Sequence, residues 1–207
     1  EHALRTLEAL DAQDYSGEWE VICVNDRSTD RTAQILEEFA AGHPRFSVVH
    51  IPMDAPFLES PKKRALETGF KTAKHEILMT MDADCIPPRG WIRSMASRFR
   101  GNIAIVQGPK KNSGSPSIVH AFQKLETLGY TSIEAAGFSM GIPMVASAAA
   151  LAYKKELFFK VGGFGDLVHL SSGDDDMLVH KMIQEPNVGF CYNLDENAVV
   201  ETAPVDS

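Results

Sequence analysis

The chain has 207 residues, of which 44% are hydrophobic and 23% charged, and its formal net charge is −8 at pH 7. This balance is typical of a soluble globular protein of one domain and differs from that of a disordered chain. The acidic charge argues against nucleic acid, or an anionic membrane surface, as the main partner. The three cysteines lie far apart without a C-x-x-C pair, which fits a reducing compartment and argues against a cysteine-rich zinc site.

Helical and strand patterns alternate along the chain. Leu4, Leu7 and Leu10 recur at helical spacing and predict an opening helix. Further helices are expected at 28–41, at 62–74, near Trp91, and at 117–135, 154–160 and 175–184. Strands are expected at 19–25, 45–51, 76–81, 102–108, 188–192 and 197–201.

One uncharged stretch, residues 135–153, is about as long as a membrane helix. Gly137, Gly141 and Pro143, together with many alanines, make it a poor membrane span. We expect a loop followed by a buried strand in this stretch.

Strands that alternate with helices predict an α/β fold in which helices cover both faces of a mostly parallel sheet. Ligands of such sheets bind outside the carboxyl ends of the strands. Two expected strands end in polar residues, Asn25 with Asp26 in one case and Asp82 with Asp84 in the other. We expect both ends to open on the same side of the sheet.

An apolar run at 77–81 ends abruptly in two carboxylates, Asp82 and Asp84, separated by one alanine. Where a strand becomes a loop, both side chains can turn toward one point. Mg²⁺ and similar hard cations take oxygen ligands and are often held by one or two carboxylates together with substrate phosphates. An ordinary solvated loop also explains a lone D-x-D, so the motif needs support from elsewhere in the chain.

Three further segments give that support, although each has a structural explanation as well. Asp26 ends a strand directly before a helix N-terminus, where anionic groups bind and where capping residues are common. Lys62 and Lys63 begin a helix and face either a diphosphate or solvent. The aspartates at 174–176 lie at another expected helix start. They either complement the helix dipole or include a general base for a hydroxyl proton.

In order and spacing, these segments resemble the inverting glycosyltransferases of family 2, which have the GT-A fold, a three-layer sandwich. The resemblance rests on "VNDRSTD", "KKRALETGF", "MDAD", "KVGGF", "GDDDML" and "ETAP", and it runs over nearly the whole chain. It implies one catalytic domain, residues 1–207, with a nucleotide-binding half at 1–110 and an acceptor-binding half at 111–207.

The resemblance also implies roles for individual residues. Asp26 would bind the uracil or ribose of a sugar nucleotide, and Lys62 matches a basic position near the nucleotide. Asp82 would contact the nucleotide-sugar, and Asp84 would bind the metal on its diphosphate. Asp175 falls at the position of the catalytic base.

The implied reaction moves a sugar, expected to come from a UDP-linked donor, to an acceptor hydroxyl with inversion. The base takes the hydroxyl proton, and a divalent metal, Mg²⁺ or Mn²⁺, offsets the charge that develops on the leaving diphosphate. Asp174 and His169 are the acceptor-side candidates. The acceptor is expected to be a carbohydrate or a lipid-linked molecule, as in polysaccharide biosynthesis.

The sequence also departs from the family. Family members usually have a strand and a turn ahead of the first helix, whereas this sequence begins at that helix. Membrane-bound polysaccharide synthases continue past a segment like "ETAP" into a Q-x-x-R-W motif and membrane helices. We therefore expect a fragment that lacks the first strand and the C-terminal part, and that is weakly active or inactive alone. Its expected location is the cytoplasm or the cytoplasmic face of a membrane, which it would touch only through segments outside this chain.

Two other functions fit parts of the pattern. A phosphatase of the haloacid dehalogenase type also places D-x-D after an apolar strand, with the first aspartate as nucleophile. This alternative leaves "VNDRSTD" and "VGGF" without a role. A sugar-nucleotide-binding relative without turnover is the other alternative, although acidic residues at all the metal and base positions disfavour it.

Overall fold

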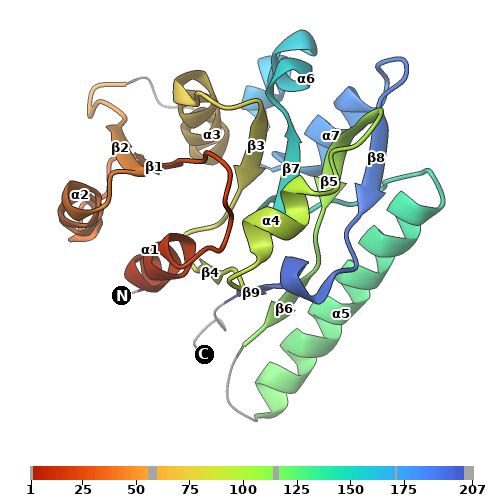
Figure 1. The fold of residues 1–207 in the computed structure, drawn as a ribbon, viewed down its shortest axis with the longest axis horizontal. Coiled ribbons are helices and arrows are strands. Elements are labelled where there is room, and N and C mark those ends of the chain that lie inside the picture. Colours follow the sequence, from red (N-terminus) through yellow and green to blue (C-terminus); the bar gives the residue numbers. More distant parts are fainter. Residues whose placement is uncertain (1, 56–59, 114–116, 171, 203–207) are drawn as a thin grey trace.

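The computed structural model describes residues 2–55, 60–113, 117–170 and 172–202 (Figure 1). The helices are α1 (His2–Asp11), α2 (Thr32–Gly42), α3 (Pro61–Thr72), α4 (Trp91–Ala96), α5 (Ile118–Ser139), α6 (Lys155–Lys160) and α7 (Asp176–Met182), with 3-10 turns η1 (Ala148–Ala150), η2 (Gly165–His169) and η3 (Glu196–Ala198). The strands are β1 (Val21–Asn25), β2 (Phe46–His50), β3 (Ile77–Thr80), β4 (Cys85–Ile86), β5 (Ile103–Gln107), β6 (Lys110–Asn112), β7 (Leu151–Lys154), β8 (Gly189–Tyr192) and β9 (Val200–Thr202).

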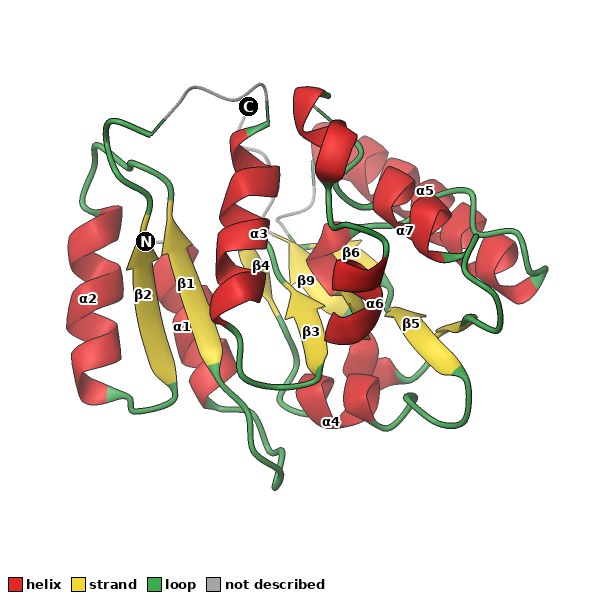
Figure 2. Cartoon of the chain, turned by 90° about the horizontal axis from the view of Figure 1, so that it is seen from above, coloured by secondary structure: helices red, strands yellow, loops and turns green. Residues whose placement is uncertain are grey.

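A sheet with the strand order β3-β7-β5-β8 forms the middle layer of the molecule (Figures 1 and 2). Alternate residues of a strand face opposite sides, so this sheet divides the core into two clusters. Ile105 and Tyr153 pack in the cluster that includes residues of α3, α5, α6 and α7. Val106 and Ala152 pack in the cluster that includes residues of α1, α2 and α4. Helices therefore cover both faces, as the α/β prediction requires.

The strand directions are mixed rather than mostly parallel. β5 pairs with β8 in parallel, but β7 runs antiparallel to both β3 and β5. The chain reaches β7 at the carboxyl end of β3, where the Thr80 hydroxyl donates to the Ala148 carbonyl oxygen at 2.6 Å. A strand that starts at that end can only run back along its neighbours, which explains the antiparallel direction.

A second, smaller sheet fixes the segment that follows β3. Its order is β4-β9-β6, with Cys85 opposite Thr202 in the antiparallel pair of β4 and β9. The turn between β3 and β4 is therefore held at both ends by strand pairing. The sequence predicts neither β4 nor β6, because two or three residues are too few for a periodic pattern.

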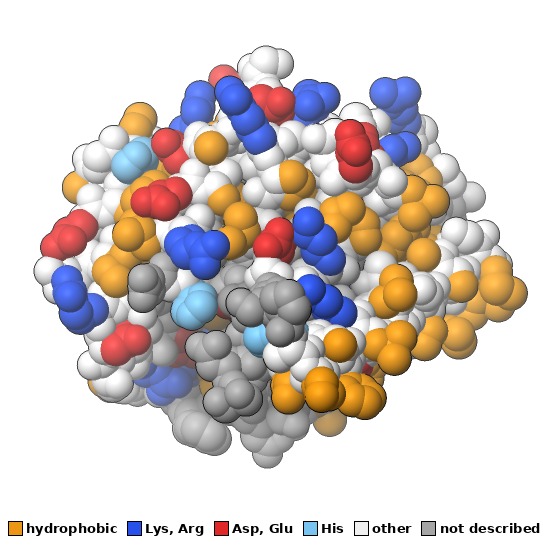
Figure 3. All heavy atoms as spheres, turned by 90° about the horizontal axis from the view of Figure 1, so that it is seen from below, with side chains coloured by type: hydrophobic (Ala, Val, Ile, Leu, Met, Phe, Trp, Pro, Cys, Tyr) orange, Lys and Arg blue, Asp and Glu red, His pale blue; other side chains and the backbone are white. Residues whose placement is uncertain are grey.

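The other expected elements are present with shifted ends. α2 begins at Thr32 rather than at 28, and α5 runs on to Ser139 before the predicted loop and the buried strand β7. α5 exposes Ile118, Phe122 and Leu125, and Figure 3 shows hydrophobic side chains gathered along the edge of the molecule that α5 forms. Within the described ranges, every helix is either too short or too polar to cross a membrane.

An apolar cavity of about 750 Å³ separates β1 from β3. Among the described strands, β1 pairs with β2 alone, and β3 lies at the edge of its own sheet. α1 and α3 both line the cavity, with Leu7 from one helix and Leu66 from the other. Two unpaired strand edges that face one another offer main-chain donors and acceptors to an extended segment rather than to a small ligand. We propose that this cavity takes the first strand that the resemblance leads us to expect.

We therefore expect an N-terminal extension to stabilise the protein. The extension is a strand rich in β-branched residues, followed by a short turn into α1. The midpoint temperature of thermal unfolding should rise by several degrees. Each kcal/mol added to the free energy of unfolding raises this midpoint by about 2–4 °C in a chain of this size. The control is the same extension with proline at its centre, which cannot donate to the ladder. Equal midpoints for both extensions would count against a strand in the cavity.

Candidate active site

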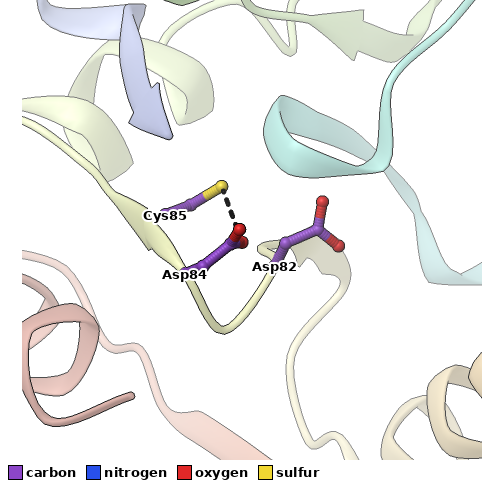
Figure 4. A group of neighbouring side chains, drawn as sticks. All are labelled: Asp82, Asp84 and Cys85. Atoms are coloured by element: carbon purple, nitrogen blue, oxygen red, sulfur yellow. Dashed lines mark hydrogen bonds between the residues drawn. The ribbon is translucent and has the colours of Figure 1, made fainter. Parts of the chain in front are cut away.

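The D-x-D residues lie on the turn between β3 and β4 (Figure 4). One carboxylate oxygen each from Asp82 and Asp84 and the sulfur of Cys85 all lie within 4.8 Å of one another. Cys85 is fully buried, and its thiol donates to Asp84 Oδ1 at 3.7 Å. Burial, together with the charges of Asp82 and Asp84, raises the pKa of this thiol to about 12. The two carboxylates are therefore the anionic ligands that this turn presents at neutral pH.

Asp82 and Asp84 fit a divalent cation such as Mg²⁺ or Mn²⁺. Hard cations prefer oxygen ligands, and one or two carboxylates suffice when a diphosphate supplies further oxygens. The turn leaves Asp84 exposed and Asp82 partly exposed, so a diphosphate can reach both side chains.

Lys62, in the first turn of α3, joins the D-x-D turn to the acidic segment before α7. Its ammonium lies 3.0 Å from Asp82 Oδ1 and 3.0 Å from Asp174 Oδ2. Partial burial lowers the pKa of Lys62, but the two carboxylates more than offset this and raise it above its ordinary value. The two predicted site residues from different halves of the chain therefore meet at one cation.

Lys63, the next residue, is fully buried and points elsewhere. Its ammonium donates to the carbonyl oxygens of Leu167, Leu170 and Ser172 at 2.7, 2.8 and 2.6 Å. All three hydrogens of the ammonium thereby find acceptors. Lys63 therefore faces neither a diphosphate nor solvent, and both interpretations of this residue from the sequence are wrong.

Asp26 follows β1, as predicted, and its carboxylate is held by two guanidinium groups. Arg64 Nη2 lies 2.8 Å and 3.1 Å from its two oxygens, and Arg27 Nε lies 2.9 Å from Oδ1. Arg27 adopts a positive φ of 57°, a conformation uncommon for a residue with a side chain. The guanidinium groups of Arg27 and Arg64 therefore both lie against the carboxylate at the end of β1.

Asp175 is the N-cap residue of α7 and lies partly buried. Its Oδ1 accepts the main-chain N–H of Asp176 at 2.9 Å, and its Oδ2 accepts that of Ala148 at 3.2 Å. Asp176 in turn accepts the N–H of Ala146 at 2.5 Å. The segment that leads into β7 therefore orients the candidate base.

The two acceptor-side candidates occupy different environments. Asp174 is 14% exposed and paired with Lys62. His169 is exposed at the end of η2, and the structure gives no contact between its side chain and Asp175. The structure thus brings Lys62, Asp82 and Asp174 together, whereas His169 is exposed and is not part of this group.

Glu134 of α5 is a buried carboxyl group that sequence reasoning missed. It is 1% exposed, and its Oε2 has no hydrogen-bond partner among the described residues. Burial raises its pKa to about 7, while Lys110 lowers it and the charges of Asp175 and Asp176 raise it further. A signal was available, since Glu134 is the single charged residue between Thr127 and Tyr153.

We expect Glu134→Gln to remove a pH-dependent cost of folding. The folded chain holds the Glu134 proton up to a pKa of about 7, whereas the ordinary pKa is 4.5, so wild-type stability should fall as pH rises between these values. Over this range the loss would be about 3 kcal/mol, because each pKa unit corresponds to about 1.4 kcal/mol. Urea unfolding of wild type and Glu134→Gln between pH 5 and pH 8 measures this loss of stability, which we expect in wild type and not in the variant.

Glu126→Gln is the matched control, because Glu126 lies on the same helix and is exposed. It should leave the slope of stability against pH unchanged. Parallel curves for wild type and Glu134→Gln would show that the buried carboxyl does not titrate in this range.

Solved structures with the same fold are known. The mannosyltransferase PcManGT from Pyrobaculum calidifontis, in complex with GDP-Man and Mn²⁺, superposes with a TM-score of 0.71 at 20% identity, over 97% of this chain and 53% of that chain. S. aureus TarS in complex with UDP-GlcNAc superposes with a TM-score of 0.70 at 18% identity, over 99% and 55%. The fold is therefore that of GT-A glycosyltransferases.

Curated relatives are more similar in sequence over shorter regions. A poly-beta-1,6-N-acetyl-D-glucosamine synthase of Staphylococcus epidermidis is 32% identical over 130 residues, which are 62% of this chain and 29% of the relative. An undecaprenyl-phosphate 4-deoxy-4-formamido-L-arabinose transferase of Pseudomonas fluorescens is 33% identical over 101 residues, 46% of this chain and 28% of the relative. The chain thus matches less than a third of the length of these proteins.

The family model for glycosyl transferase family 2 matches residues 2–158, well over half of the sequence. The chain belongs to this family.

Proposed function

We propose that the chain is the catalytic part of an enzyme that transfers a sugar from a nucleoside-diphosphate sugar to an acceptor hydroxyl with inversion. The observation that carries this proposal is the position of Lys62. Its ammonium lies 3.0 Å from a carboxylate of the D-x-D turn and 3.0 Å from the carboxylate of Asp174, next to the candidate base. A donor-binding turn and a base must lie this close for one displacement to occur between two bound substrates.

On the donor side, Asp84 would hold the metal, Mg²⁺ or Mn²⁺, and Asp82 would contact the nucleotide-sugar. When bound, the metal would supply positive charge to the leaving diphosphate. Lys62 would add a second positive charge at the same place. Asp26, oriented by Arg64, is the candidate contact to the uracil or ribose of the donor.

On the acceptor side, Asp175 would take the proton of the attacking hydroxyl. The N–H groups of Ala148 and Asp176 hold its carboxylate in one orientation. A base fixed in this way needs no rearrangement when the hydroxyl attacks the anomeric carbon. Asp174 and His169 are the candidate contacts to the acceptor.

The relatives support the choice of substrates. TarS binds UDP-GlcNAc, and the synthase from Staphylococcus epidermidis is named for a polymer of N-acetylglucosamine, so we propose a UDP-linked donor. The acceptor would be a carbohydrate chain or a lipid-linked molecule, as the names of the polysaccharide synthase and the undecaprenyl-phosphate transferase suggest. We propose that the reaction takes place in the cytoplasm or on the cytoplasmic face of a membrane. Segments outside this chain would make any contact with that membrane.

The family assignment favours this function over the phosphatase alternative, in which Asp82 would be a nucleophile. In the structure Asp82 is paired with Lys62, an arrangement that suits an electrostatic role. A binding protein without turnover would share the donor site, so only a rate measurement separates it from an enzyme.

Calorimetric titration of UDP tests the donor site. We expect binding in the presence of Mn²⁺, loss of binding in EDTA, and at least about a tenfold weaker affinity in Asp84→Ala, a loss typical of metal-site changes. Asp11→Ala, an exposed aspartate at the end of α1, is the matched control and should bind like wild type. Equal affinity with Mn²⁺ and with EDTA would contradict the proposed metal site.

Asp175→Asn separates catalysis from binding. It should keep the wild-type affinity for UDP and lower the rate of UDP release from UDP-GlcNAc by about 10²–10⁴-fold, the usual contribution of a general base. An unchanged rate would remove Asp175 from the base role.

A further inference from the structure

Lys63 is the most completely buried cation in the described part of the chain, with an exposed fraction of 0%. Its three hydrogen bonds run to main-chain carbonyl oxygens more than a hundred positions later in the sequence, at Leu167, Leu170 and Ser172. Each donor–acceptor distance lies between 2.6 and 2.8 Å, as is typical of charge-assisted hydrogen bonds. The Lys63 ammonium therefore holds together the loop that contains Leu167, Leu170 and Ser172, which we call the acceptor loop.

That loop leads directly into the candidate base. It runs from η2 through Ser172 to Gly173, whose φ of +79° favours glycine, and then to Asp174 and Asp175. An anchor at Ser172 therefore fixes the chain only three residues before the base. A hydrogen bond from the N–H of Ala148, in another segment of the chain, also fixes the side chain of Asp175.

Lys62 and Lys63 differ in how they relate to substrates. Lys62 is 47% exposed and lies beside the partly exposed carboxylate of Asp82, so a donor can reach it. Lys63 is enclosed, and its donors are saturated by carbonyl oxygens. It therefore acts on the chemistry through the loop and not by touching a substrate.

We propose that Lys63 is a positioning residue that ties the donor-side helix α3 to the acceptor loop, described at 167–170 and 172–175, and so sets the place of the base. The inference rests on the proposed function. It adds a residue that the family resemblance does not supply, because the basic position of the resemblance is Lys62.

Burial of an ammonium is costly, but replacing Lys63 also leaves three carbonyl oxygens of the loop without their donor. We therefore expect Lys63→Met to unfold at a lower temperature than wild type. A positioning role is shown by a further effect, a change in the position and mobility of the loop in the folded protein.

The experiment compares Lys63→Ala, Lys63→Met and the control Lys71→Met, an exposed lysine of α3 paired with Glu67. In both Lys63 variants we expect kcat for UDP release from UDP-GlcNAc to fall about 100-fold, the cost of a small misplacement of a catalytic group. Metal-dependent UDP affinity should stay at the wild-type value. Propylammonium chloride, which replaces the missing part of the side chain, should restore kcat in Lys63→Ala but not in Lys63→Met.

Hydrogen exchange gives a readout that does not depend on turnover. Main-chain amides of 167–170 and 172–175 should exchange faster in both Lys63 variants, and propylammonium should slow them again in Lys63→Ala alone. Unchanged exchange in this loop, or loss of UDP affinity together with kcat, would overturn the inference. Failure of wild type to bind UDP would instead reject the proposed function, and the exchange result would still decide whether Lys63 anchors the loop.

Discussion

The arrangement of the site depends on three consecutive cations in the first turn of α3. Lys62 binds Asp82 and Asp174, Lys63 binds three carbonyl groups of the acceptor loop, and Arg64 binds Asp26. Positive charge at a helix N-terminus opposes the helix dipole, so these side chains need acidic or carbonyl partners. These partners belong to three separate segments of the chain. One helical turn thereby connects the end of β1, the D-x-D turn and the segment before α7.

The sheets supply the framework that makes these connections specific. β3 and β4 hold the D-x-D turn at both ends, and the antiparallel strand β7 starts beside the end of β3. Because β7 starts there, Ala146 and Ala148 lie where their N–H groups reach Asp176 and Asp175. The unexpected direction of β7 is therefore part of the reason that the candidate base lies near the donor carboxylates.

Much of this could be predicted from the sequence. The abrupt end of an apolar strand in Asp82 and Asp84 and the aspartates at a helix start indicated the chemistry, because strand ends and helix starts are local features. Pairings between distant segments were not predictable. No periodicity reveals that Lys63 turns inward to carbonyl groups while its neighbour Lys62 turns toward carboxylates, since both begin the same helix. Strands as short as β4 also carry too few residues to be recognised, although β4 decides where the D-x-D turn is held.

The central claim is that Lys62 couples the donor turn to the acceptor segment. Hydrogen exchange of the wild-type chain with Mn²⁺ alone and with Mn²⁺ plus UDP tests it most directly. We expect slower exchange on UDP binding both at 82–86 and at 172–178, because the two segments share one cation. Protection confined to 82–86, with 172–178 unchanged, would contradict the coupling.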